Sequence, residues 1–153
     1  MDELLGVAVI LLALYALSQG QGQDYPGGDV VAYPLVDAIW WSSASAARYG
    51  IPNEPPPETM FNLARLRDAV DSVFGAGGYT VTSGYRSAEL NAKLGELGYS
   101  ASPTSLHMRG RAADIAVPSM DVTSAAELAR SSGLFVEVIP YPEDGHIHVA
   151  IGA

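Results

Sequence analysis

The chain has 153 residues, no cysteine and a formal net charge of −9 at pH 7. The absence of cysteine excludes a disulfide scaffold, a thiolate metal site and a cysteine nucleophile, so any metal site must use His, Asp and Glu. Only eight residues are Lys or Arg, and they are scattered. We therefore expect no nucleic-acid partner, because phosphate contacts need clustered basic side chains.

The chain begins with an uninterrupted apolar run at residues 4–17, LLGVAVILLALYAL. We predict an apolar helix over residues 1–18 that is a membrane anchor or signal-like segment, although most membrane spans need about 17–25 residues. An export signal is an alternative, but Asp2 and Glu3 stand where basic residues are expected. The third interpretation is a packing helix, so residues 4–18 are expected to contact a membrane or a partner protein.

A change of composition separates this run from the rest of the chain. Residues 19–34 are rich in Gly, Gln and Pro in their first half and predict a flexible linker. The remaining residues, 35–153, are long enough for one compact domain with its own core and leave no room for a second.

Helical patterns open the domain. Residues 35–49 predict a helix that carries both tryptophans and ends at Gly50. Residues 51–57, IPNEPPP, predict a proline-stiffened loop. The apolar residues of the segment 58–74 fall largely on one stripe and predict a second helix.

Strand patterns dominate the later part of the chain. Two short helices are predicted there, over residues 87–94 with Ser87 as N-cap and over residues 123–132 with Thr123 as N-cap. Strands are predicted over residues 79–82, 111–117, 135–139 and 146–151, the last two joined by the loop PYPEDG. Because helices come first and strands dominate later, we predict an α+β fold with a small antiparallel sheet and flanking helices.

The residues that could carry chemistry gather near Asp114. All three histidines lie in the last third of the chain: His107, His146 and His148. An Asp flanked by Ala and Ile in a buried strand is costly unless it is paired or binds a metal. The alternative is an Asp114 that caps a loop or pairs with Arg109 or Arg111.

The final strand carries the motif His146-Ile147-His148, and strand alternation puts both imidazoles on one face. That arrangement suits one metal ligand beside one catalytic or substrate-binding group, and the alternative is a pair of half-exposed histidines. Two His and one carboxylate are a common catalytic zinc set, with water in the fourth position. The candidate bases for that water are Glu143, Asp144 and His146; a lower-ranked arrangement makes His146 a ligand and Glu143 the base.

Arg86 follows Ser83-Gly84-Tyr85 at the end of a predicted strand. A guanidinium in that position could bind a substrate carboxylate or a developing oxyanion. The alternative is a surface Arg paired with one of the many acidic side chains.

Four stretches together resemble the zinc D-Ala-D-Ala carboxypeptidase family, which includes many phage endolysins. They occur in family order as SSASAARYGIPNEPPPETMFNLARLRDAV, TVTSGYRSAELNAKLG, SLHMRGRAADI and HIHVAIG. The combination of SGYRS with S-x-H-x-x-G-x-A-x-D-I is highly specific. The family belongs to the LAS-type metallopeptidases, and its relatives include lysostaphin-type endopeptidases. The signalling domain of hedgehog has a similar fold.

The resemblance implies an α+β zinc peptidase domain over residues 35–153, with the metal on the face of the sheet. It implies Zn²⁺ as cofactor and the peptidoglycan stem peptide as partner. The implied zinc ligands are His107, Asp114 and His148. The expected catalytic residues are His146, Glu143 and Arg86, and the expected substrate-binding residues are Arg86, Tyr85 and Ser105.

One departure from the family pattern affects the mechanism. Many members carry an acid three residues before the last histidine ligand, and that position here is Gly145. The expected function is a D,D-carboxypeptidase or endopeptidase that cuts peptidoglycan with metal-activated water, in the cell envelope (periplasmic or membrane-anchored) or associated with a phage. The alternative is a catalytically weak or inactive metal-binding module that binds wall peptides as a virion or envelope component.

Overall fold

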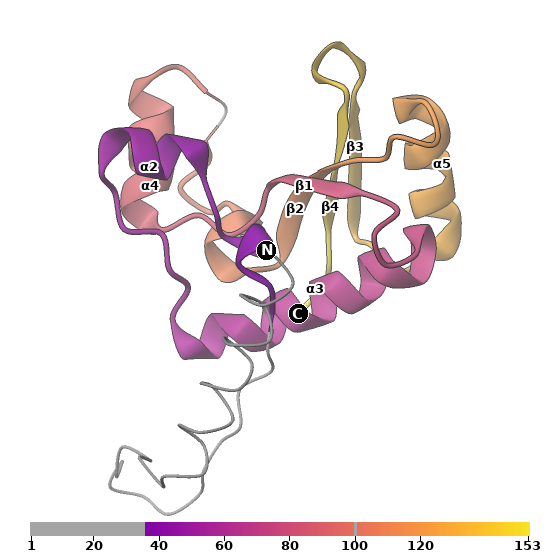
Figure 1. The fold of residues 1–153 in the computed structure, drawn as a ribbon, viewed down its shortest axis with the longest axis horizontal. Helices are drawn as coiled ribbons and strands as arrows, with labels where there is room; N and C mark the ends of the chain where they lie inside the picture. Colours follow the sequence, from indigo (N-terminus) through magenta and orange to yellow (C-terminus); the bar gives the residue numbers. More distant parts are fainter. Residues whose placement is uncertain (1–35, 100) are drawn as a thin grey trace, which may run out of the picture. The chain divides into compact units, whose positions relative to one another are not determined.

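A computed structural model describes residues 36–99 and 101–153, and shows helices around a four-stranded antiparallel sheet (Figure 1). The prediction of an α+β fold with a small antiparallel sheet is confirmed for this part of the chain. The predicted apolar helix at 1–18 and linker at 19–34 lie outside the described residues. Within the described ranges, no helix combines the length and the apolar character needed to cross a membrane.

The sheet places its two central strands next to each other although they are far apart in the sequence. Its order is β1-β2-β4-β3, and all three pairs are antiparallel. In this register Asp114 lies opposite His148, and Ile139 lies opposite the same histidine on the other side. The strands are β1 (Thr80–Ser83), β2 (Ala112–Ala116), β3 (Glu137–Tyr141) and β4 (His146–Ala150).

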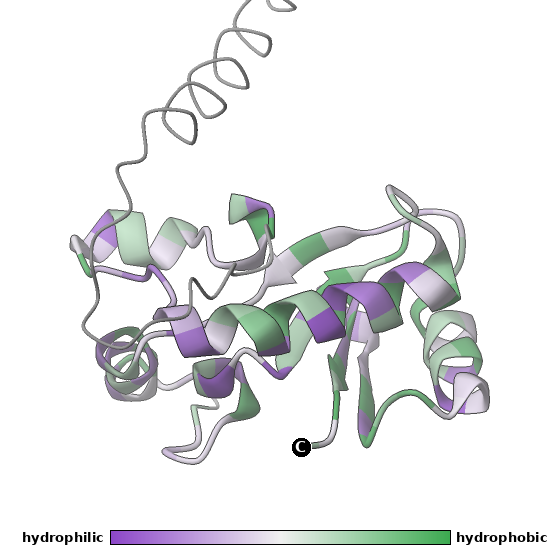
Figure 2. Ribbon diagram, turned by 90° about the horizontal axis from the view of Figure 1, so that it is seen from below, coloured by the Kyte–Doolittle hydropathy of each residue, from purple (hydrophilic) through white to green (hydrophobic). Residues whose placement is uncertain are grey.

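One face of the sheet is apolar and packs against α3 (Pro57–Phe74) and α5 (Val122–Ser132). Hydrophobic and hydrophilic residues alternate along α3, as expected for a helix with one buried side (Figure 2). The largest fully buried aliphatic side chains of this core are Leu63, Leu66, Val70, Ile115, Ile147 and Val149. Each contributes roughly 1.5–3 kcal/mol when fully buried. The core thus fixes one face of the sheet and leaves the other for the polar side chains.

The predicted helix at 35–49 is wrong in its extent, because the chain breaks it into η1 (Ala38–Trp40) and α2 (Ala44–Tyr49). The backbone carbonyl of Trp40 accepts a hydrogen bond from the backbone N–H of Tyr85 at 2.7 Å. A continuous helix would use that carbonyl for the residue four positions later. The Ser43 side chain then caps α2 by accepting from a backbone N–H of its first turn.

The remaining helices follow their predicted positions closely. Ser87 caps α4 (Ala88–Glu96), as predicted. The cap of α5 is Asp121 rather than Thr123, because its carboxylate accepts hydrogen bonds from both the backbone and the hydroxyl of Ser124. Two short 3-10 helices complete the order, η2 (Leu106–Arg109) and η3 (Pro142–Asp144).

Candidate metal centre and active-site cleft

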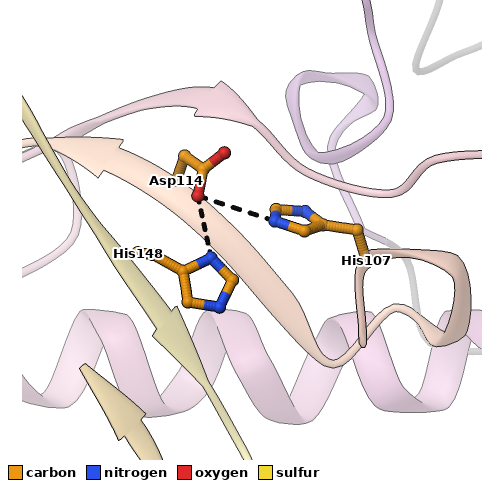
Figure 3. A group of neighbouring side chains, drawn as sticks. All are labelled: His107, Asp114 and His148. Carbon is orange, nitrogen blue, oxygen red and sulfur yellow. Dashed lines mark hydrogen bonds and ion pairs between the residues drawn. The ribbon is translucent and has the colours of Figure 1, made fainter. Parts of the chain in front are cut away.

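Three side chains from three separate segments converge on the open face of the sheet (Figure 3). His107 comes from η2, Asp114 from β2 and His148 from β4. The chain turns from η2 into β2 at Gly110, which has a left-handed φ of 64°. A Cβ at this position would lie 2.7 Å from the Thr59 side chain, so glycine is required there for both conformation and space.

The distances between the potential ligand atoms suit a single metal ion. Asp114 Oδ1 lies 2.9 Å from His148 Nδ1 and 3.5 Å from His107 Nε2. The three ligand atoms all lie within 4.8 Å of one another. Donor atoms that share a tetrahedral zinc at the usual bond lengths are roughly 3.4 Å apart. The residues present therefore fit a zinc ion.

His107 is held in the state that a metal ligand requires. Its side chain is buried, and its Nδ1 lies 2.7 Å from the backbone carbonyl oxygen of Gly84. A carbonyl can only accept, so Nδ1 carries a proton, and Nε2 is the nitrogen that faces Asp114 and is available to a metal. Burial lowers the pKa of His107, against the opposing influence of Asp114. A neutral imidazole is the form that binds metal.

Asp114 is ionised and has one oxygen fixed by a cation. Burial alone would raise the pKa of Asp114, but hydrogen bonds and charge interactions with His107 and His148 hold it well below its usual range. Its Oδ2 accepts a hydrogen bond from the Arg86 guanidinium at 3.0 Å, which leaves Oδ1 facing the two imidazoles. The structure thus pairs this carboxylate with Arg86, whereas the alternative from sequence paired it with Arg109 or Arg111.

Arg86 is held in place by the strand end that precedes it. Its Nε and Nη2 atoms donate to the hydroxyl oxygen of Ser83 at 3.0 and 2.9 Å. Burial lowers the pKa of Arg86, and the charge of Asp114 opposes that shift. The guanidinium thus lines the cleft and holds Asp114 at the same time.

The three candidate ligands line an open cleft with a volume of about 590 Å³. Both residues predicted to bind substrate beside Arg86 line this cleft. Tyr85 is mostly buried and packs in the core cluster, and burial raises the pKa of its hydroxyl. Ser105 is half-buried at the start of η2.

The candidate bases differ in their position. His146 lines the cleft on the same face as His148, and its ring centroid lies 5.0 Å from that of Tyr141. Asp144 also lines the cleft, whereas the exposed Glu143 is not among the lining residues. Gly145, which stands where the family pattern has an acid, takes a left-handed φ of 70° at the end of η3.

Sequence reasoning missed Glu137, whose Oε2 lies 3.3 Å from His148 Nε2. This half-exposed carboxylate shares the cleft face of β3 with Ile139 and Tyr141. Strand alternation could have grouped these three side chains. The predicted strand at 135–139 begins and ends two residues before β3, however, and the sequence did not give the register that brings Glu137 to the histidine.

Fold and site together define an α+β protein with two histidines and one aspartate clustered in a cleft on the open face of a small sheet. A family model described as Peptidase M15 matches residues 37–150. The chain therefore belongs to the Peptidase M15 family of zinc peptidases, and the predicted relationship to zinc D-Ala-D-Ala carboxypeptidases is confirmed. A search of curated proteins finds no match.

Proposed function

We propose that this protein is a zinc-dependent peptidase that hydrolyses peptide bonds of bacterial peptidoglycan, as a D,D-carboxypeptidase or an endopeptidase. The observation that carries the proposal is the cluster of His107, Asp114 and His148 in the lining of an open cleft, in a chain of the Peptidase M15 family. A stem peptide is a short extended substrate, and the cleft volume of about 590 Å³ suits a ligand of that size.

His107, Asp114 and His148 would hold the zinc, which would supply a water with a pKa of about 7 and Lewis acidity for the scissile carbonyl. His107 and Asp114 hold their donor atoms toward the metal position through Gly84 and Arg86. Arg86 also lines the cleft, where its guanidinium is placed to stabilise negative charge on the carbonyl oxygen. Preorganised donors of this kind need no rearrangement during the reaction.

Proton transfer needs a side chain that faces the cleft. His146 and Asp144 meet that condition, and we favour His146 because it stands on the same strand face as the ligand His148. Its imidazole would take a proton from water and give one to the leaving amine nitrogen. Glu143 is exposed outside the cleft lining, so it would have to move to act as the base.

The proposal is tested by digesting purified peptidoglycan with the full zinc-loaded chain and measuring the released fragments by mass spectrometry. Asp114→Asn keeps the shape of the side chain but removes its charge, so we expect zinc affinity to fall by more than about 100-fold, beyond the usual effect of a residue outside the ligand set. Fragment release should be lost with it. The matched control is Asp68→Asn, at an exposed position on α3.

A second candidate function is a metal-binding module that grips wall peptides without cutting them. The glycine at position 145, in place of the family's acid, is the observation that favours it. Binding of zinc and of soluble stem peptides with no fragment released from several wall types would support this module and reject the peptidase. Zinc-dependent fragments that disappear in Asp114→Asn would reject the module, and their masses would identify the bond.

A further inference from the structure

We infer that Glu137 is a positioning residue for the metal centre, because its carboxylate fixes His148 in the tautomer that presents Nδ1 to the metal. This inference rests on the proposed zinc site. It concerns a residue outside the group of candidate ligands, on β3, one of the two edge strands of the sheet. The contact that carries it is the 3.3 Å distance between Glu137 Oε2 and His148 Nε2.

The two ring nitrogens of His148 face different carboxylates. Nδ1 lies 2.9 Å from Asp114 Oδ1, in the ligand cluster, and Nε2 faces Glu137. A neutral imidazole has one N–H and one lone pair. Both carboxylates can only accept, so the tautomer depends on which nitrogen a metal takes. A metal held between Nδ1 and Asp114 would need the Nδ1 lone pair, and the proton would then lie on Nε2, where the Glu137 carboxylate can accept it. Ligand histidines commonly donate their second N–H to such a partner.

The two histidine ligands have their second nitrogens fixed in different ways. His107 donates its Nδ1–H to the backbone carbonyl of Gly84, a partner that no side-chain substitution removes directly. His148 depends on a side chain, so the contribution of this hydrogen bond can be measured by mutation. The difference also predicts that His148 is the more easily misoriented of the two ligands.

The register of the sheet holds Glu137 in this position. β3 pairs with β4 so that Ile139 lies opposite His148, and Glu137 is the next residue on the same face. The outer edge of β3 is fixed as well, because the Arg130 guanidinium donates to the Val138 carbonyl oxygen at 3.0 Å. A rigid strand therefore carries the carboxylate, as a positioning role requires.

Glu137 orients the ligand and does not act as the base for the reaction. Its carboxylate contacts Nε2, whereas the ligand cluster lies at Nδ1 of the same ring. The imidazole therefore stands between Glu137 and the metal position. A base must reach the water that the metal binds, and His146 and Asp144 line the cleft without such an obstruction.

The experiment measures zinc affinity of the full chain by competition with a chelator, for the wild type, Glu137→Ala and Glu137→Gln. We expect a loss of about 10- to 100-fold for Glu137→Ala, the usual effect of removing a partner of a metal ligand. Glu137→Gln should lose less, because its amide oxygen still accepts the Nε2–H. In the zinc-loaded wild type, nitrogen NMR should show a protonated, hydrogen-bonded Nε2 on His148, and this signal should weaken in Glu137→Ala.

Two further measurements separate positioning from general stability. Glu127→Ala removes an exposed carboxylate from α5 and should leave zinc affinity unchanged. The urea midpoint of each variant in excess EDTA should equal that of the wild type. The inference would be overturned if the metal-free Glu137→Ala protein had a lower urea midpoint and this loss of stability explained its whole loss of zinc affinity. It would also be overturned if Glu137→Ala bound zinc within twofold of the wild type.

The same titration separates this inference from the proposed function. If the wild type binds zinc and Asp114→Asn does not, the metal site stands, and only the Glu137 data decide the inference. If Asp114→Asn binds zinc as the wild type does, the proposed site itself is wrong, and the inference is overturned with it.

Discussion

His146 has its ring plane set by a neighbour on the adjacent strand. It lies opposite Tyr141, and the two rings are 5.0 Å apart with an interplanar angle of 31°. We expect His146→Ala to lower kcat on wall fragments by roughly 10²- to 10⁴-fold, the usual contribution of a general acid or base. Zinc affinity should stay within about threefold of the wild type, because His146 lies outside the ligand cluster.

The competing bases provide matched comparisons for this prediction. Asp144→Asn tests the second cleft-facing group, and Glu143→Gln tests an exposed acid from the same turn. The kinetics of all three variants should be measured beside their zinc affinity. Full activity in His146→Ala together with a large loss in either acid variant would assign the proton transfer to that acid instead.

The predicted ligand residues could be grouped from sequence because each sits in a short motif with a strong local pattern. Alternation put both histidines of the last strand on one face, and the cost of an unpaired Asp114 in a buried strand marked it as a candidate ligand. The full set of three ligands came from the family resemblance. The partners that set their chemistry could not be found in this way. Glu137 and the Gly84 carbonyl reach the histidines through strand pairing and loop packing, which the local pattern does not encode.

At the scale of elements, the junction between η1 and the end of β1 supports the metal site. The Trp40 carbonyl accepts from the Tyr85 backbone, and the preceding residue, Gly84, holds His107 through its own carbonyl. A Cβ on Gly84 would lie only 2.0 Å from the Trp40 carbonyl oxygen. The end of β1 and η1 can pack this closely only because residue 84 is a glycine, which has no Cβ.

We therefore expect Gly84→Ala to destabilise the protein by about 3 kcal/mol, at the upper end of overpacking costs, because backbone atoms must move. Gly95→Ala is the matched control. Gly95 lies within α4, and its Cβ would meet only ordinary contacts with Ala101, at 3.8 and 3.9 Å, so stability should be unchanged or rise by up to about 1 kcal/mol. Urea unfolding monitored by circular dichroism measures both values, and equal effects would contradict the close-approach argument.

Element types were easier to predict than element limits. The helices α3, α4 and α5 and the strands β1, β2 and β4 arise within one or two residues of their predicted limits, whereas β3 lies two residues later than predicted and includes the first two residues of the predicted loop. The break between η1 and α2 was missed because it depends on a tertiary hydrogen bond to the Trp40 carbonyl. Similarly, Asp121 replaces Thr123 as the cap of α5, since either residue type suits that position locally.

At the scale of the whole molecule, Tyr79 connects the end of α3, the approach to β1 and η1. Its hydroxyl donates to Asp71 Oδ1 at 2.7 Å, and its ring packs edge-on against Trp40 at 6.1 Å. The local sequence pattern predicted a helix or strand in each of these segments, but it did not predict which of them contact each other. The strand order β1-β2-β4-β3 also required three-dimensional information, because sequence neighbours β2 and β3 do not pair.

The Tyr79 contacts predict a pH dependence of global stability. Burial and the hydrogen bond to Asp71 raise the pKa of Tyr79 above its usual value of about 10. Above pH 10 the unfolded chain releases a proton that the folded protein keeps, so the free energy of unfolding falls as the pH rises. Tyr79→Phe should cost about 1.5 kcal/mol at neutral pH through the lost hydrogen bond to a charged group. It should also show a shallower decline between about pH 9 and 11.

Urea denaturation at a series of pH values measures both effects. Tyr99→Phe is the matched control, because this exposed ring lines the cleft and is not part of the core. The free energy of unfolding of this variant should depend on pH as that of the wild type does. The wild type and Tyr79→Phe share all other titrating groups, so the difference between their two curves isolates Tyr79. Parallel curves for the wild type and Tyr79→Phe would show that this hydroxyl does not resist ionisation in the folded protein. The contact with Asp71 would then not link α3 to β1 in the way that the 2.7 Å distance indicates.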